Sequence, residues 1–510
     1  MQHILLLPLS LLFSSILISQ TSLKEIDLNY GSYDVGFQHY TQVDSSRMYR
    51  IHNEHNRQWG YRPIPMSIWY PAEVKNSSQV TMTVLDYLQV LKEEEEWEQL
   101  PDEFLLDWFP YLWNTPENQA HLPEKTIAIK DAAWLAGSFP VVVYSPSYQA
   151  SSMENFALCE YLASHGYVVI ASPSRGTDTR WLEGGTVKDM ETQSRDVEFL
   201  LREIHRYPQI NTGQITLMGF SFGGLSNALT VMKQPQVKAV ISLDGTERYR
   251  YDVLASSAYF NLARFDRPYA HFAQKEIPAE ILQSDNMPAS LNTEFALYDS
   301  SQDSDIYCYR FHDLTHGYFS SFGVLFGNRD PRQDKSDTKI MASYRLVCEH
   351  VLQFLHGQLQ GDAHALAFME RSPAQNGYAK TLLTQQKKKA QTPPFDYRTF
   401  IDLAYQQDYA DLIPLYEKIK EQHPDLELQE GMINILGLYL SFDPATYAQG
   451  VRIFQMAIHL YPNSSNLYDS LGEAYYLHED YPKAKEVFRQ SLVLNPENGN
   501  ATRRLQEMGQ

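Results

Sequence analysis

Between residues 30 and 360, short apolar runs alternate with longer segments whose apolar residues recur every three or four positions. The short runs, such as "FPVVVYSP" and "YVVIASP", are apolar throughout, which is typical of strands buried on both faces of a sheet. The alternation predicts an α/β domain over residues 25–360, with a mostly parallel sheet covered by helices on both faces. The expected strands are 33–41, 62–70, 140–144, 167–171, 214–218, 239–243, 268–273 and 305–311, and the expected helices are 154–165, 188–206, 225–233 and 343–359.

One segment interrupts this alternation. Residues 84–113 have a helical pattern with an acidic run, Glu93 to Glu96, followed by the dense apolar stretch "FLLDWFPYLW". We interpret the segment as a helical insertion packed on the edge of the sheet. The alternative is a lid that contacts an apolar substrate.

The C-terminal part of the chain has a different pattern. Residues 361–395 include the polar stretch "TLLTQQKKKAQTPP" and are interpreted as a linker, whereas residues 396–510 are helical throughout. Residues 466–498 resemble one tetratricopeptide repeat, an earlier copy follows the same pattern with one residue inserted, and a third around Phe400 to Pro424 is looser. The matching positions are Tyr468, Leu471, Gly472, Tyr475, Ala484, Phe488 and Pro496, and in the earlier copy Leu436, Gly437, Phe454, Ala457 and Pro462. Such repeats imply a protein partner or self-association.

Composition narrows the classes of function. The 510 residues carry a net charge of -20, which argues against nucleic acid as a partner, because binding to phosphates depends on Lys and Arg. The three cysteines, Cys159, Cys308 and Cys348, are too few and too far apart for a disulfide framework or a zinc site. No phosphate-binding loop or dinucleotide motif is present, so no cofactor or metal is expected.

The N-terminal segment, residues 1–20, is an apolar run with the length of a signal peptide. It is short and interrupted by Ser and Pro, so a membrane span is the weaker interpretation, although its start lacks the Lys and Arg typical of a signal peptide. We expect an exported protein, periplasmic or extracellular, and an uncleaved N-terminal anchor is the alternative.

The stretch "LMGFSFGG" contains the pattern G-x-S-x-G around Ser221. In this pattern a serine lies on a sharp turn between a strand and a helix, where the small neighbours allow the chain to double back. The flanking segments "QITLM" and "LSNALTVMK" have the strand and helix patterns that the turn requires. Ser221 is therefore a candidate nucleophile, although a glycine-rich structural turn would have the same flanks.

A nucleophilic serine needs a base and an acid, and in this fold they follow the serine in the order acid, then histidine. Asp244 ends the strand "VKAVISL", at the sheet edge where Ser221 is expected, and Asp285 is its rival. His316 follows the last strand in a loop and is favoured as the base over His312, which lies closer to the strand.

These residues carry a resemblance to a known family. The segments "YDVGF", "RPIPMSIWYPAE", "LASHGYVVIASPSRG", "GFSFGG" and "VKAVISLDG" resemble the platelet-activating factor acetylhydrolases, among the dienelactone-hydrolase-like α/β-hydrolases. The resemblance implies Ser221 as nucleophile, Asp244 rather than Asp285 as acid, and His316 as general base. It also implies that the backbone N–H groups of Phe222 and Tyr148 form the oxyanion hole.

The sequence thus predicts an α/β-hydrolase fold followed by an all-α module similar to tetratricopeptide repeats. The resemblance implies a serine hydrolase that cleaves short-acyl or lipid-like carboxylic esters through an acyl-serine intermediate. One alternative is a peptidase or amidase on the same fold. Another is a catalytically degenerate hydrolase that acts as a binding protein. Ser145, Pro146 and Ser147 stand where the family has Ser-His-Gly in its oxyanion loop; the glycine lets the backbone turn its N–H toward the substrate, and Pro146 restricts the loop.

Overall fold

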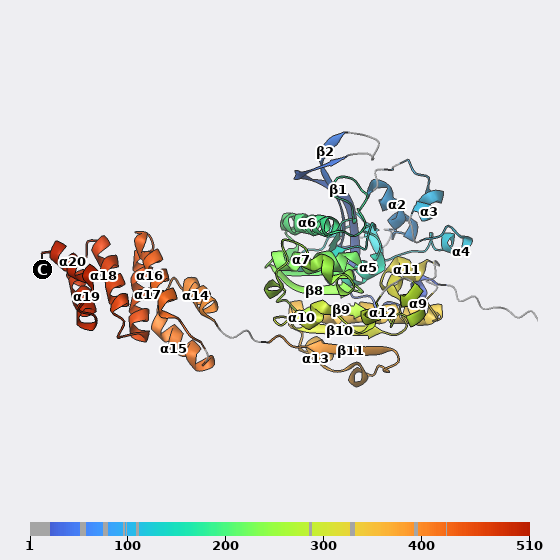
Figure 1. Cartoon of the computed structure of the whole chain (residues 1–510). Helices are drawn as coiled ribbons and strands as arrows, with labels where there is room; N and C mark the ends of the chain where they lie inside the picture. Colours follow the sequence, from blue (N-terminus) through green and yellow to red (C-terminus); the bar gives the residue numbers. More distant parts are fainter. Residues whose placement is uncertain are drawn as a thin grey trace, which may run out of the picture. The chain divides into compact units, whose positions relative to one another are not determined.

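The computed structural model describes residues 21–50, 58–74, 80–94, 97, 99–108, 112–284, 288–326, 332–391, 396–424 and 426–509. The chain forms two compact units, residues 1–391 and 392–510 (Figure 1). The predicted signal peptide, residues 1–20, and the rival acid Asp285 lie outside the described residues. Within those residues, no helix is both long and apolar enough to cross a bilayer.

The first unit is built on one mixed sheet. Its strand order is β11-β10-β9-β8-β7-β5-β6-β2-β1-β3, with β4 paired to β2. The six neighbouring strands β6, β5, β7, β8, β9 and β10 are parallel to one another. β11 pairs antiparallel with β10, β2 pairs antiparallel with β6 and with β1, and β1 pairs parallel with β3. The strands are β1 Asp34–Arg50, β2 Trp59–Glu73, β3 Ala128–Lys130, β4 Ala133–Trp134, β5 Phe139–Ser145, β6 Val168–Ala171, β7 Ile210–Phe220, β8 Val237–Leu243, β9 Tyr269–Ala273, β10 Ile306–Phe311 and β11 Leu383–Lys388.

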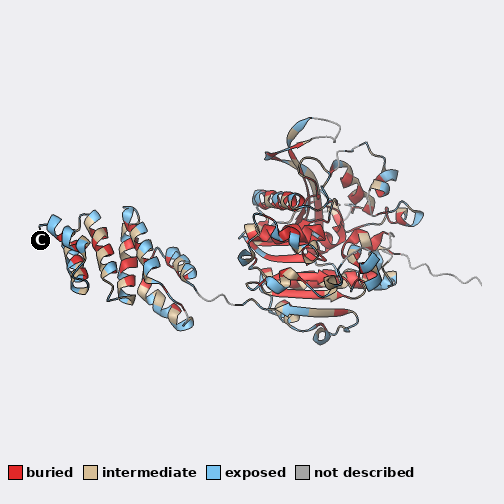
Figure 2. Cartoon of the chain, viewed as in Figure 1, coloured by how far each residue is buried: buried red, intermediate tan, exposed pale blue. Residues whose placement is uncertain are grey.

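Helices cover both faces of this sheet, which confirms the predicted α/β fold class. The helices of the first unit are α1 Leu23–Ile26, α2 Val84–Glu94, α3 Leu105–Trp108, α4 Pro116–Gln119, α5 Phe156–Ser164, α6 Val187–Glu203, α7 Phe222–Lys233, α8 Tyr251–Ala255, α9 Ala279–Ser284, α10 Ala296–Ser300, α11 Ser321–Leu325, α12 Asp337–Gln360 and α13 Ala363–Glu370. In β5, Val142 and Tyr144 join the core under α5 and α12, whereas Val141 and Val143 join the core under α6 and α7. Successive side chains of a strand point to opposite faces, so a fully apolar strand supplies both cores. Figure 2 shows the central strands of the sheet coloured as buried.

The insertion begins with α2, which packs on the first unit through Tyr87. The Tyr87 hydroxyl accepts a hydrogen bond from Trp69 Nε1 at 2.9 Å and donates one to Glu160 Oε1 at 2.7 Å. Its ring also lies 5.2 Å from the ring of Phe37 and 4.7 Å from that of Phe156. This part of the insertion is therefore a fixed component of the core.

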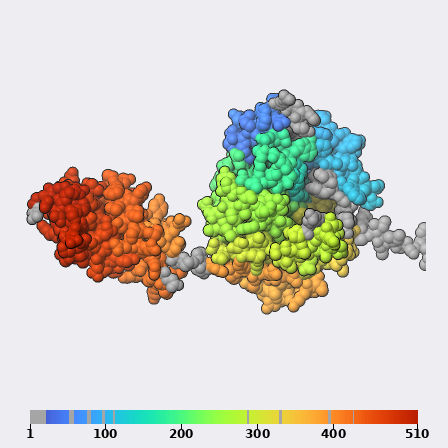
Figure 3. All heavy atoms as spheres, viewed as in Figure 1, coloured from blue at the N-terminus to red at the C-terminus, as the bar shows by residue number. Residues whose placement is uncertain are grey.

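The prediction of a linker over residues 361–395 is wrong for most of that range. Residues 363–370 form α13, and β11 pairs antiparallel with β10 as the edge strand of the sheet. The β11 end of the sheet lies opposite the β1–β2 end in Figures 1 and 3. An edge strand can be polar because one side faces water, and lysines there oppose pairing with another chain. The polar composition of β11 is therefore the reason that the sequence predicted a linker in place of this edge strand.

The second unit consists of successive antiparallel helices. They are α14 Tyr397–Gln406, α15 Leu412–Gln422, α16 Glu430–Phe442, α17 Tyr447–Leu460, α18 Ser465–Leu477, α19 Tyr481–Leu494 and α20 Gly499–Glu507. The same contact recurs in two of the helix pairs, because Gly437 packs on the ring of Phe454 and Gly472 on the ring of Phe488. A glycine at this position lets two helices approach closely.

This contact predicts a difference between two glycines of α16. A Cβ at Gly437 would lie 2.8 Å from ring carbons of the buried Phe454, whereas a Cβ at Gly431 would meet nothing within 4 Å. We expect Gly437→Ala to destabilise the α16–α17 pair by about 1–3 kcal/mol. Gly431→Ala should be neutral or stabilising, because alanine favours a helix. Hydrogen exchange of α16 and α17 in the full chain measures both, and equal protection in the two variants would contradict the packing.

Candidate active site

The turn at Ser221 has the geometry that a nucleophile requires. It follows β7 and precedes α7, with φ 53° and ψ -117°, a conformation that costs a non-glycine residue free energy. A Cβ added to Gly219 would collide with the backbone of Gly223, and one added to Gly223 would collide with the carbonyl of Ser145. Both glycines of the G-x-S-x-G pattern are therefore needed sterically.

The structure brings together Ser221, His316 and Asp244. His316 Nε2 lies 2.9 Å from Ser221 Oγ, and His316 Nδ1 lies 2.6 Å from Asp244 Oδ2. Asp244 follows β8 directly, and His316 begins a short 3-10 helix, His316–Phe319, in the loop after β10. Three segments that are far apart in sequence thus supply one continuous hydrogen-bonded chain.

Asp244 is buried and held as a charged carboxylate. Burial alone would favour its protonated form, but hydrogen bonds and the charge of His316, together with the backbone N–H of Gln274, outweigh this and lower its pKa. Its Oδ1 accepts from that N–H and from the Tyr249 hydroxyl, each at 3.0 Å. Gln274 Nε2 in turn donates to the Tyr249 hydroxyl at 3.0 Å. The carboxylate is therefore oriented from both oxygens.

Sequence reasoning missed Tyr249 and Gln274. Both follow a strand, as Asp244 does, but no motif distinguishes them from other loop residues.

His312, the alternative to His316 as the base, lies elsewhere in the structure. Its Nε2 is 3.0 Å from Thr384 Oγ1 of β11. His312 thus belongs to the edge of the sheet and not to the group around Ser221.

The predicted oxyanion residues lie next to each other. The Phe222 ring contacts the Tyr148 ring edge-on at 5.7 Å, and Phe222 opens α7, where a backbone N–H has no partner within the helix. In the described part of the chain, neither the Phe222 N–H nor the Tyr148 N–H donates to a protein group. Both donors therefore lack an acceptor within the described protein.

The loop that carries Tyr148 is fixed in spite of Pro146. Glu154 accepts hydrogen bonds from the Ser147 N–H at 2.9 Å and from the Ser147 hydroxyl at 2.6 Å. The Pro146 carbonyl accepts from Gln193 Nε2 at 2.9 Å. The left-handed residue that turns this loop is Gln149, with φ 58°. The resemblance implies a glycine at position 147 for this turn, and the structure makes the turn two residues later, at Gln149.

A second loop, residues 180–182, contacts the loop that carries Tyr148 and the insertion. Gln149 binds this loop through the Arg180 carbonyl at 2.7 Å and the Leu182 N–H at 2.9 Å. The Arg180 guanidinium lies 4.7–5.5 Å from the rings of Trp97, Trp108 and Trp181. Such cation–π contacts join the insertion to the loop beside Tyr148. No pattern in the sequence groups these residues.

The described residues contain no group of three or more His, Cys, Asp or Glu side chains arranged to hold a metal ion. Cys159, Cys308 and Cys348 are buried and unbridged. Burial raises the pKa of the Cys308 thiol to about 12, so this thiol stays protonated near neutral pH.

A parallel sheet with helices on both faces, and a serine on a strained turn at its carboxyl edge, define an α/β-hydrolase. Residues 110–432 match the model of the X-Pro dipeptidyl-peptidase (S15) family, and the chain belongs to this family. The match includes Ser221, Asp244 and His316. The chain is therefore that of a hydrolase.

Two further comparisons complete this result. A ferulic acid esterase from Streptomyces cinnamoneus is similar in structure, with 17% sequence identity, a TM-score of 0.47, and coverage of 69% of this chain and 96% of the esterase. No curated protein sequence matches the chain significantly. The resemblance to the platelet-activating factor acetylhydrolases stays a prediction.

The environment of Asp244 predicts the effect of removing one donor. Tyr249→Phe takes a hydrogen bond from a buried charge, so we expect a loss of about 1.5–3 kcal/mol in the free energy of unfolding. Tyr251→Phe is the matched control, because the Tyr251 ring packs edge-on against Phe260 and its hydroxyl forms no hydrogen bond within the described residues. Urea unfolding at neutral pH measures both, and equal midpoints would contradict a bond between Tyr249 and Asp244.

Proposed function

We propose that this protein is a serine hydrolase that cleaves carboxylic esters through an acyl-Ser221 intermediate. The observation that carries the proposal is the hydrogen-bonded chain from Ser221 through His316 to the buried Asp244. A serine hydroxyl is a poor nucleophile until a base removes its proton. This arrangement supplies the base and a negative charge that holds the base in the correct tautomer.

In the proposed reaction, Ser221 Oγ attacks the ester carbonyl while His316 Nε2 accepts its proton. The charge that develops on the carbonyl oxygen is stabilised by the N–H groups of Phe222 and Tyr148. His316 then gives the proton to the leaving alkoxide, which departs as an alcohol. A water molecule, deprotonated by His316, cleaves the acyl-serine ester and releases the acid.

Apolar side chains around this site favour a short-acyl or lipid-like ester. The Tyr148 ring is 39% exposed and lies on Phe222, and Trp181 is 47% exposed on the neighbouring loop. The Tyr148 hydroxyl accepts a hydrogen bond from the Gly184 N–H at 2.8 Å, which fixes the ring against that loop. Exposed aromatic surfaces beside a nucleophile favour apolar substituents.

The second candidate is a peptidase, and the family match supports it. A dipeptidyl-peptidase must bind the ammonium group at the end of its substrate, which requires an accessible carboxylate. Among the described carboxylates near the loop that carries Tyr148, Glu154 is buried and bonded to Ser147, and Glu94 is buried and accepts from the Ser152 N–H at 3.2 Å. Glu183 is exposed on the neighbouring loop and forms an ion pair with Lys188 at 2.6 Å. All three are engaged by other groups of the protein, which favours an ester over a peptide.

We also propose that the helical second unit, which resembles tetratricopeptide repeats, binds a protein segment or a second copy of the chain. The exposed side chains of Met432, Ile435, Tyr439 and Phe442 follow one face of α16 and support this proposal. Export from the cytoplasm remains a prediction from residues 1–20.

Three substrates test the ester proposal. We expect turnover of p-nitrophenyl butyrate and none of butyryl-p-nitroanilide or Ala-Pro-p-nitroanilide, because the described carboxylates near the Tyr148 loop are already engaged by Ser147, Ser152 and Lys188. Ser221→Ala should lower kcat on the ester by about 10⁶-fold. Absorbance at the nitrophenolate and nitroaniline bands measures these rates. Faster turnover of Ala-Pro-p-nitroanilide than of the ester would assign the chain to the peptidases.

A further inference from the structure

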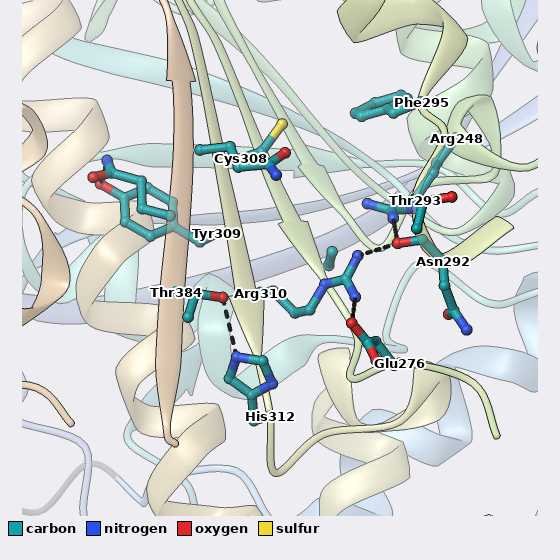
Figure 4. Close-up of a pocket in the computed structure, with 13 residues that line it drawn as sticks. Arg248, Glu276, Asn292, Thr293, Phe295, Cys308, Tyr309, Arg310, His312 and Thr384 are labelled. Carbon is teal, nitrogen blue, oxygen red and sulfur yellow. Dashed lines mark hydrogen bonds and ion pairs between the residues drawn. The ribbon is translucent and has the colours of Figure 1, made fainter. Parts of the chain in front are cut away.

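A cavity lies at the β10–β11 end of the sheet, and Ser221, His316 and Asp244 are not among its lining residues. It has a volume of about 540 Å³, which is within the range of small-molecule sites. Its walls come from β10, β11, the loop after β9 and the segment before α10 (Figure 4). The residues used below are Arg248, Arg310, Glu276, Asn292, Phe295 and His312.

Two guanidinium groups meet in this cavity. Arg310 donates to the Asn292 carbonyl oxygen at 2.7 Å, and Arg248 donates to the same oxygen at 3.3 Å (Figure 4). Arg248 also lies over the Phe295 ring, 5.6 Å from its centre. Arg248 also donates to the Leu291 carbonyl oxygen at 3.4 Å, so the two positive charges converge on neutral carbonyl acceptors.

The cavity supplies little negative charge in return. Glu276 forms an ion pair with Arg310 at 3.0 Å, but the Glu276 side chain is 70% exposed, so water screens this pair. Within the described residues, no carboxylate lies within ion-pair distance of Arg248. Among the residues that the structure describes, one of the two positive charges thus has no ion-pair partner.

The electrostatics of Arg310 agree with this imbalance. Burial, and then the positive charge of Arg248, lower the pKa of Arg310, and Glu276 offsets this only in part. Burial, followed by the charge of Arg310, likewise lowers the pKa of His312 on the same side of the cavity, so this imidazole is neutral near pH 7. A bound anion would relieve the repulsion between the two guanidinium groups.

We propose that this cavity binds a small molecule through a carboxylate or phosphate group held between Arg248 and Arg310. The paired oxygens of such a group fit the planar donors of arginine. The site adjoins the catalytic acid, because Arg248 precedes Tyr249, which donates to Asp244, and Glu276 follows Gln274 closely. The proposal does not depend on the reaction at Ser221.

Calorimetric titration of the full chain with inorganic phosphate, at constant ionic strength, tests the proposal without any assay of activity. We expect saturable binding that weakens at least about tenfold in Arg248→Gln and in Arg310→Gln, as for loss of one charge-assisted hydrogen bond. Arg206→Gln, at an exposed arginine of the 3-10 helix Ile204–Arg206 that does not line the cavity, should bind as the wild type does. No saturable binding, or equal affinity in all four proteins, would overturn the proposal.

A variant that is expected to bind phosphate more tightly distinguishes a lost site from a misfolded protein. Glu276→Gln removes the exposed carboxylate that competes with the anion, so we expect it to bind phosphate several-fold more tightly. Unchanged or weaker binding in this variant would count against the site, because the ligand would then not take the place of Glu276 beside Arg310.

The anion in this cavity could be part of an ester substrate or a separate small molecule. Measuring KM for two esters, one neutral and one bearing a carboxylate, with and without phosphate, distinguishes these cases. Phosphate that raises the KM of the carboxylate ester alone assigns the cavity to the anionic end of a substrate. Phosphate that binds in the calorimeter and leaves both KM values unchanged assigns it to a separate small anion. Either result supports the site only if Arg310→Gln abolishes the phosphate effect or the binding.

Discussion

The close approach of α7 to the end of β5 is the constraint on which the site depends. Gly223 has no room for a side chain against the Ser145 carbonyl, and Gly219 has none against Gly223. This packing forces Ser221 into a strained conformation and points its hydroxyl out of the turn. It also places the first N–H of α7 beside the loop that carries Tyr148.

The same turn fixes the acid relative to the nucleophile. The Ser221 N–H donates to the Leu243 carbonyl at 3.1 Å, and the Thr246 N–H donates to the Ser221 carbonyl at 2.8 Å. Asp244 lies between these two bonds, so the ends of β7 and β8 cannot shift separately. His316 comes from a different loop, and its position depends on Asp244, which is itself held by Tyr249 and Gln274. The backbone hydrogen bonds between the ends of β7 and β8 therefore fix the positions from which Ser221, His316 and Asp244 form their hydrogen bonds.

Much of this arrangement could be predicted from sequence, because motifs and strand ends report backbone geometry. The apolar runs predicted the strands of the sheet, and the order of Ser221, Asp244 and His316 along the chain indicated which loops meet. β11 was missed, since a polar edge strand has the composition of a linker. The two arginines beside Asn292 and the tryptophans around Arg180 were also missed. They come from separate loops, and only the fold brings them together.

We propose that His316 and Asp244 activate Ser221 as a nucleophile. Labelling with a fluorophosphonate probe tests this activation. The probe forms a bond only with an activated serine. We expect the wild type to be labelled at Ser221, Asp244→Asn to react about 10⁴-fold more slowly, and Asp285→Asn to react as the wild type does. A folded wild type that stays unlabelled, or a label on another residue that persists in Ser221→Ala, would contradict the account.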